Sequence, residues 1–360
     1  MEQLIPHEWF EGMHWALLFL IGGGALCLLI RGADLLVEGA SGIALRLGIS
    51  KVIVGATIVS LGTTSPEAAV SVMAAIAGNS GLALGNAVGS VIADTGLIFG
   101  IGCLLMALPV ERFILNRQGW VQFGSAMMLA VFAYGAWLIP DGSNSLGRST
   151  GIIFLICLAW YMWSSVKWGK EHTDRQNRLD SEQNVAGEEA GKVLEKAEHD
   201  PWSKLIPFFL GGLIMVIFFG RVVIVCAQEG AQQAGVPKMV IAGTIVAFGT
   251  SLPELMVGIT AIKKGHAGML IGNVVGADVL NILFVIGASA FATPLNLLDP
   301  EAVIPELFLY LHLPAMLLIL MIFRIFIFDA MRNGRFKRWH GVPLLLIYVG
   351  YLVLNMLYAR

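Results

Sequence analysis

One six-residue segment occurs twice in this chain with nearly the same letters. Residues 62–67 read GTTSPE and residues 249–254 read GTSLPE, and each copy is followed by a GNxVG segment, at 85–89 and at 272–276. The offset is constant, because 254 − 67 and 273 − 86 both equal 187. A motif pair that returns without insertion or deletion indicates a duplicated structure.

The chain that carries these motifs is too apolar for a soluble protein. It is 57% hydrophobic and only 13% charged, whereas soluble domains average about 25% charged residues. Because about 20 apolar residues cross the core of a bilayer as a helix, the hydropathy pattern predicts ten membrane spans. They are residues 15–39, 50–77, 81–107, 118–139, 149–168, 205–228, 239–262, 268–292, 303–328 and 341–358.

A polar stretch divides the chain into two halves. Residues 169–204 mix both signs of charge and contain almost no aromatic side chains, as expected of a solvated linker. Five predicted spans precede this stretch and five follow it, so the second half must enter the membrane from the opposite side. We therefore predict an all-α membrane protein of ten transmembrane helices in two inverted five-helix repeats, residues 1–168 and 205–360, joined by a cytoplasmic linker.

The loop charges predict the orientation of this multi-pass protein. Lys and Arg concentrate in cytoplasmic loops, and in the ten-helix layout the basic residues occupy alternate loops. The segment before the first span and the loop at 141–147 contain neither Lys nor Arg, so both termini are expected outside. The residues on the predicted cytoplasmic side are Arg46, Lys51, Arg112, Arg117, Lys170, Arg175, Arg178, Lys263, Lys264, Arg332, Arg335, Lys337 and Arg338.

Each repeated motif places one carboxylate, Glu67 or Glu254, inside an apolar run. A carboxylate at bilayer depth costs roughly 2.5–3.5 kcal/mol, so such residues are usually functional. Each glutamate follows a proline, Pro66 or Pro253, which removes a backbone donor and frees carbonyl oxygens of the preceding turn. Carboxylates, carbonyls and hydroxyls are the ligands that Na⁺ and Ca²⁺ prefer. The hydroxyls available in the two motifs are Thr63, Thr64, Thr250 and Ser251.

The next helix of each repeat begins with a small-xxx-small glycine spacing, which permits close helix contact in a membrane. We expect this contact, through Gly85 and Gly272, to bring a polar face to the glutamates. In the first repeat that face contains Asn86, Ser90 and Asp94, spaced i, i+4 and i+8; in the second it contains Asn273, Ala277 and Asn281. The two earlier asparagines either contribute to the site or bond a neighbouring helix backbone.

These motifs resemble the sodium/calcium exchanger family of the cation/calcium exchanger superfamily, prokaryotic type, whose repeats read approximately GTSLPE and then GNxxGSxxxN/D. The resemblance is strong over residues 55–100 and 242–287. It implies a non-enzymatic secondary antiporter of a prokaryotic cytoplasmic membrane, which exchanges Na⁺ for Ca²⁺ by alternating access and needs no cofactor. The implied ion ligands are Glu67, Glu254, Asp94, Thr63, Thr64, Thr250, Ser251, Ser90 and Asn281, with the carbonyls of Ser60 and Ala247. The implied supporting residues are Asn86, Asn273, Gly85, Gly272, Pro66 and Pro253.

Two departures from the family pattern affect the expected ion ligands and leave the number of acids at three. Ala277 stands where a serine ligand is common, and the acid of the Asp94/Asn281 pair lies in the first repeat instead of the second. Three buried carboxylates would require three Na⁺, or one Ca²⁺ with one proton. On that count we expect Asp94 to be protonated when Ca²⁺ is bound.

Other functions stay open at this stage. H⁺/Ca²⁺ or K⁺-dependent exchange would use the same site, and a channel would offer no reason for inverted repeats. An intramembrane protease could use Ser251 as nucleophile, with His312 as the one histidine at a suitable depth. We expect inorganic cations and the lipid bilayer as partners, with neither nucleic acid nor an obligate protein partner.

Overall fold

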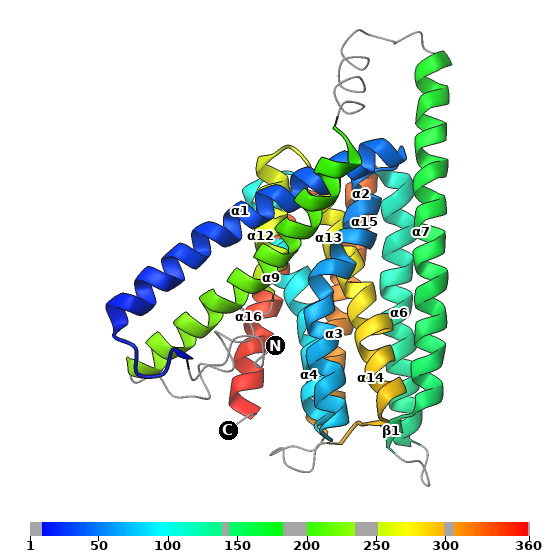
Figure 1. Ribbon diagram of the computed structural model, residues 1–360. Coiled ribbons are helices and arrows are strands. Elements are labelled where there is room, and N and C mark those ends of the chain that lie inside the picture. The colour runs from blue at the N-terminus through cyan, green and yellow to red at the C-terminus, as the bar shows by residue number, and fades with distance from the viewer. Residues whose placement is uncertain (1–8, 139–143, 183–199, 235–250, 299–305, 359–360) are drawn as a thin grey trace.

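A computed structural model describes residues 9–138, 144–182, 200–234, 251–298 and 306–358. The chain is helical, and two long helices, α1 (Trp15–Leu47) and α9 (Trp202–Gln233), lie side by side at a slant to the other helices (Figure 1). Small residues allow this close pairing: a Cβ on Gly39 would lie 2.6 Å from the Phe209 nitrogen, within overlap distance.

The remaining helices form a bundle beside this pair (Figure 1). The helices that flank the motif segments are α6 (Arg112–Leu138), α7 (Arg148–Glu182), α15 (Leu313–Asn333) and α16 (Gly341–Tyr358). A π-helical turn, η6 (Phe308–His312), leads into α15, and a 3₁₀ turn, η7 (Arg338–His340), leads into α16. The strands β1 (Ser145–Leu146) and β2 (Leu295–Asn296) pair antiparallel at one end.

The motif segments form two sets of helices with matching boundaries. The first set contains α4 (Ser80–Ala93), the π-helical turn η3 (Asp94–Phe99) and α5 (Gly100–Leu105). The second contains α13 (Ala267–Leu280), the π-helical turn η5 (Asn281–Ile286) and α14 (Gly287–Ala292). Each element begins 187 residues after its counterpart, since 267 − 80, 281 − 94 and 287 − 100 agree. The predicted duplication is therefore present in the local structure.

Helices before these two sets carry the glutamates. In the first half, α2 (Lys51–Val54), the π-helical turn η2 (Gly55–Val59) and α3 (Ser60–Ile76) follow one another without a break. In the second half, the description begins at residue 251, immediately before α12 (Leu252–Lys263). The rest of the predicted span at 239–262 lies outside the described residues.

Eight helices in the described part of the chain are long and apolar enough to cross a membrane. They coincide with eight of the ten predicted spans. The other two predicted spans, 50–77 and 239–262, are those that contain Glu67 and Glu254. The ten-helix count and the inversion of the halves therefore stay predictions, whereas the all-helical architecture is confirmed.

The first part of the predicted linker is helical. Helix α7 continues to Glu182, well past the predicted end of its span at residue 168, and projects beyond the bundle (Figure 1). The extension is rich in Glu, Lys, Arg and Gln, which are good helix formers even where no core is available. Polarity thus predicted the end of the membrane span, but not the end of the helix.

One of the two predicted glycine contacts is visible. A Cβ on Gly272 would overlap the Val52 carbonyl oxygen, and a Cβ on Gly276 would lie 2.5 Å from the Ser60 Oγ. Helix α13 therefore packs directly on the backbone of α2 and η2. Gly85 has no described atom within 4 Å of such a Cβ, so its predicted contact is not seen among the described residues.

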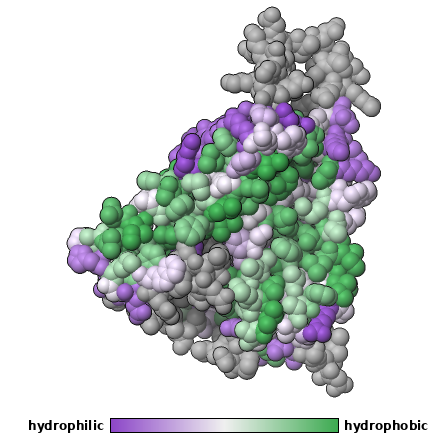
Figure 2. All heavy atoms as spheres, viewed as in Figure 1, coloured by the Kyte–Doolittle hydropathy of each residue, from purple (hydrophilic) through white to green (hydrophobic). Residues whose placement is uncertain are grey.

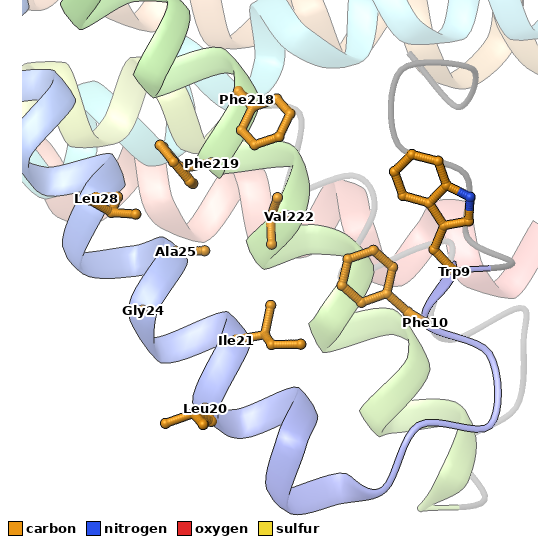
Figure 3. Close-up of a pocket in the computed structure, with 10 residues that line it drawn as sticks. All are labelled: Trp9, Phe10, Leu20, Ile21, Gly24, Ala25, Leu28, Phe218, Phe219 and Val222. Carbon is orange, nitrogen blue, oxygen red and sulfur yellow. The ribbon is translucent and has the colours of Figure 1, made fainter.

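The lateral surfaces of the molecule are hydrophobic, and hydrophilic residues gather mainly at the upper end (Figure 2). A groove of about 510 Å³ opens between α1 and α9 and is almost entirely apolar (Figure 3). Leu20, on its rim, is 73% exposed, as expected for a side chain that faces lipid. The residues that line the groove are Trp9, Phe10, Leu20, Ile21, Gly24, Ala25, Leu28, Phe218, Phe219 and Val222.

Several loops predicted to be cytoplasmic meet at one end of the molecule. Lys264 Nζ lies 3.6 Å from Asp34 Oδ1 and 3.7 Å from Glu38 Oε2, and Lys51 Nζ lies 2.9 Å from His266 Nδ1. Burial, and secondarily the Lys51 ammonium, lower the pKa of His266. These contacts connect α1 and α2 to the loop between α12 and α13. The side of the membrane that this end faces stays a prediction.

Candidate cation site

The two motif glutamates lie together in the interior. Glu67 on α3 and Glu254 in the first turn of α12 are 4% and 3% exposed, and their carboxylates lie within electrostatic reach of each other. The Thr63 hydroxyl, from the first half, lies close enough to the Glu254 carboxylate, from the second, to interact with it. The structure therefore brings the two copies of the motif into one cluster.

The hydroxyls of the first motif face the interior. Thr63 and Thr64 are fully buried; Thr63 Oγ1 lies 3.4 Å from the Ser60 carbonyl oxygen, and Thr64 Oγ1 has no described partner. Ser65 points the other way, because its hydroxyl is exposed and donates to the Leu61 carbonyl of its own helix. Ser251 of the second motif is buried at the N-terminus of α12. Thr250 and Ala247 lie outside the described residues, so their roles stay predictions.

Asn86 and Asn273 join helices. Asn86 Nδ2 donates to Ser71 Oγ at 2.9 Å and to the Glu67 carbonyl oxygen at 3.4 Å. The Ser60 hydroxyl lies 2.6 Å from the Gly55 carbonyl oxygen and 3.0 Å from that of Asn273, so its one proton is shared between a helix of the first half and a helix of the second. Of the two roles expected for these asparagines, the observed contacts are those of helix bonding. They fix the helix segments that present Glu67 and Thr63.

Asp94 and Asn281 occupy equivalent positions at the starts of η3 and η5, and they meet. Asn281 Nδ2 lies 3.5 Å from Asp94 Oδ2. Asp94 is buried and lies within electrostatic reach of Glu67 and Glu254. Wide π-helical turns often occur at functional sites, and here each one begins with a polar side chain of the cluster. Ser90, one turn before Asp94, is also buried, and its hydroxyl has no described partner.

The expected count of three buried carboxylates was wrong, because Asp278 is a fourth. It is fully buried in α13 and lies within electrostatic reach of Asp94. Its Oδ2 accepts hydrogen bonds from Thr95 Oγ1 and Gln122 Nε2, both at 2.5 Å. The sequence contained a signal, since Asp278 interrupts an apolar run. It was overlooked because it lies off the i, i+4, i+8 face and its counterpart in the first repeat is Val91.

Many buried oxygens of this cluster have no hydrogen-bond partner within the described ranges. Leaving such atoms unpaired costs roughly 1–3 kcal/mol each, so their concentration in one place calls for a ligand. They are Thr64 Oγ1, Glu67 Oε2, Glu254 Oε2, Ser90 Oγ, Asp94 Oδ1, Asp278 Oδ1 and Asn281 Oδ1. A set made only of carboxylate, hydroxyl and amide oxygens fits Na⁺ or Ca²⁺, and does not fit soft transition metals.

Acids alone do not complete this site. In the described part of the chain, no three His, Cys, Asp or Glu side chains are gathered closely enough to hold a metal ion. A cation at the cluster would therefore depend on hydroxyl, amide and carbonyl oxygens as well as on the carboxylates. This mixed donor set is the one that both motifs supply.

The histidine required by the protease alternative is engaged elsewhere. His312 Nδ1 lies 2.7 Å from the Tyr351 hydroxyl of α16, and the two rings are in edge contact. The Tyr351 hydroxyl therefore provides the hydrogen-bond partner of the His312 ring. This pairing gives no support to a catalytic dyad with Ser251.

Comparisons with known proteins agree with this geometry. The family model described as sodium/calcium exchanger protein matches residues 15–167 and 204–357. Sodium/calcium exchanger MaX1 of Methanosarcina acetivorans is 31% identical over 356 residues, covering 94% of this chain and 97% of the relative. Putative antiporter CaxA of Alkalimonas amylolytica is 31% identical over 339 residues, covering 93% of this chain and 97% of the relative.

The fold also matches a solved structure. The sodium-calcium exchanger NCX_Mj superimposes with a TM-score of 0.73 at 24% identity, covering 95% of this chain and 98% of the other. At this identity the likeness concerns the fold. It extends across both halves of the chain.

Proposed function

The chain belongs to the sodium/calcium exchanger protein family, and we propose that it is a secondary active antiporter that exchanges Na⁺ for Ca²⁺ at one shared site. The observation that carries this proposal is the meeting of Glu67 and Glu254 in a buried cluster of unpaired oxygens. The proposed ligands are the two glutamates, Asp94 and the hydroxyls of both motifs, with Thr250 and the carbonyls of Ser60 and Ala247 as predicted members.

Charge balance supports exchange over independent binding. Four carboxylates buried together repel one another and must be neutralised by cations or protons. Ca²⁺ takes six to eight oxygen ligands, so it and Na⁺ would compete for the same carboxylates. Mutually exclusive binding, in a protein whose access changes from one side to the other, couples the two fluxes.

The proposed architecture is the inverted-repeat one. Two five-helix halves, residues 1–168 and 205–360, would rock about the site, with the linker in the cytoplasm and both termini outside. The protein would lie in a prokaryotic cytoplasmic membrane, without a cofactor and without an obligate protein partner. The constant offset of the duplicated elements supports this arrangement.

Exchange driven by H⁺ or K⁺ is the second candidate. The observation that favours it is the fourth acid, Asp278, because an additional carboxylate provides one more position for a monovalent ion or a proton. Ala277, at a position where the family pattern has serine, also removes one hydroxyl from the site that would bind Na⁺.

Transport by the purified protein in liposomes decides between these candidates. We expect an outward Na⁺ gradient to drive uptake of radioactive Ca²⁺, because both ions require the same carboxylates. Equal K⁺ and H⁺ gradients are the matched comparisons, and empty liposomes give the leak. Uptake driven by K⁺ or H⁺ but not by Na⁺ would select the second candidate, and no Ca²⁺ movement under any gradient would refute both.

A further inference from the structure

Asp278 is the acid of the cluster whose counterpart in the other repeat, Val91, is apolar. It belongs to α13 but faces α6 and η3, where its described hydrogen-bond partners, Gln122 and Thr95, are both neutral. The side chain is fully buried. A charged carboxylate in such a place is strongly unfavourable unless a positive charge compensates it.

The two oxygens of Asp278 differ in their surroundings. Oδ2 accepts two hydrogen bonds, one from the Thr95 hydroxyl and one from the Gln122 amide. Oδ1 has no partner among the residues that the structure describes. A proton on Oδ1 would create an O–H donor that has no acceptor among the described residues. Protonation would therefore replace an unpaired acceptor with an unpaired donor. A cation beside Oδ1 would satisfy the oxygen and neutralise the charge together.

Two further unpaired oxygens lie in the same region. Asn281 is three residues after Asp278, close to one helical turn, and is 1% exposed; its Nδ2 reaches toward Asp94 Oδ2, and its Oδ1 has no described partner. Asp94 Oδ1 is likewise buried and unpaired, and Asp94 adjoins Thr95 in sequence. The amide of Asn281 thus lies near Asp94 at the start of η3, and the next residue of η3, Thr95, bonds Asp278 of α13.

We propose that Asp278, Asn281 and Asp94 form a further binding position for one dehydrated alkali cation, Na⁺ or K⁺, displaced from the two glutamates toward α6. Asp278 adds one unit of negative charge to the three of Glu67, Glu254 and Asp94, and one monovalent ion balances it. Carboxylate and amide oxygens are suitable ligands for such an ion. The proposal rests on the proposed function, since this ion would be an additional charge in the exchange cycle.

Equilibrium binding to the purified full-length protein tests the position. Radioactive Na⁺ and Rb⁺, the latter in place of K⁺, are titrated without Ca²⁺ in alkaline buffer. We expect Asp278→Asn to bind one alkali cation fewer per chain than the wild type and to keep the others. Asp174→Asn, at an exposed position on α7, should bind as the wild type does. The isotope whose binding is lost identifies the ion.

The wild type supplies a measurement that does not depend on how the variant folds. The four carboxylates of the cluster, Glu67, Glu254, Asp94 and Asp278, predict four alkali cations per chain in alkaline buffer, and saturation at three would overturn the proposal. Equal Na⁺ and Rb⁺ binding by Asp278→Asn and wild type would also overturn it. So would a variant in which only the pH dependence of binding changes, because the compensating ion would then be a proton.

Failure of this site and failure of the proposed function are distinguishable. If a Na⁺ gradient drives Ca²⁺ uptake but Asp278→Asn loses no alkali cation, the additional position is wrong and the antiport stands. If no gradient moves Ca²⁺ but Asp278→Asn still loses one bound alkali cation, the position stands and the antiport is wrong.

Discussion

Replacing Glu254 with Gln is expected to weaken Ca²⁺ binding by about 100-fold or more, and to abolish Na⁺-driven uptake. The substitution keeps the shape of the side chain but removes one charge from a cluster with almost no access to solvent. Losing one member of a buried charged contact typically costs about 2–5 kcal/mol, and about 2.7 kcal/mol corresponds to 100-fold in affinity. Binding of radioactive Ca²⁺ to purified protein measures the effect.

Two other variants make this result specific. Glu67→Gln should behave like Glu254→Gln, because the two carboxylates, one from each motif, lie within electrostatic reach of each other. Glu171→Gln is the matched control: Glu171 lies on the polar extension of α7, where it forms a surface ion pair with Arg117 at 3.0 Å. Such pairs contribute at most about 1 kcal/mol to stability. Wild-type Ca²⁺ affinity in Glu67→Gln would show that the two motifs do not share an ion.

Replacing Gly272 with Ala is expected to destabilise the protein by about 1–3 kcal/mol, the usual cost of overpacking, and to reduce transport. The new Cβ would overlap the Val52 carbonyl oxygen. A backbone atom cannot move aside as a flexible side chain can, so α13 must shift away from α2. That shift would also move Asn273, whose carbonyl oxygen lies 3.0 Å from the Ser60 hydroxyl. Thermal unfolding in detergent, together with Ca²⁺ uptake, reports both effects.

Gly135→Ala is the control for this substitution. Gly135 lies within α6, and a Cβ there meets no described atom within 4 Å. Alanine is a better helix former than glycine by about 1 kcal/mol, so this variant should be as stable as the wild type or more stable. A Gly272→Ala protein with an unchanged unfolding temperature would contradict the close packing of α13 on α2.

The duplicated elements could be predicted because the repeat is recorded twice in the sequence. The constant spacing between Glu67 and Asn86, and between Glu254 and Asn273, fixes the same helical geometry in both halves. The two motif glutamates were equally predictable, since burying a charge in an apolar run is costly and such acids are usually functional. These two signals predict that the halves meet at the glutamates.

Other features depended on contacts that no local pattern contains. Asp278 could not be predicted from the duplication, because its counterpart in the first repeat, Val91, is apolar. Comparing the two repeats identifies only positions that are polar in both. The helix-joining bonds of Asn86 and Asn273 require neighbours distant in sequence, Ser71 and Ser60. The extension of α7 into the linker was missed because hydropathy reports burial in lipid and not helix propensity.

The position of bound Ca²⁺ tests the central claim most directly. An anomalous difference map from crystals of the Ca²⁺-bound protein should show one strong peak in contact with carboxylate oxygens of both Glu67 and Glu254, at about 2.3–2.6 Å. A peak that touches only one of the two glutamates, or that lies away from both, would contradict a cation site shared between the two halves of the chain.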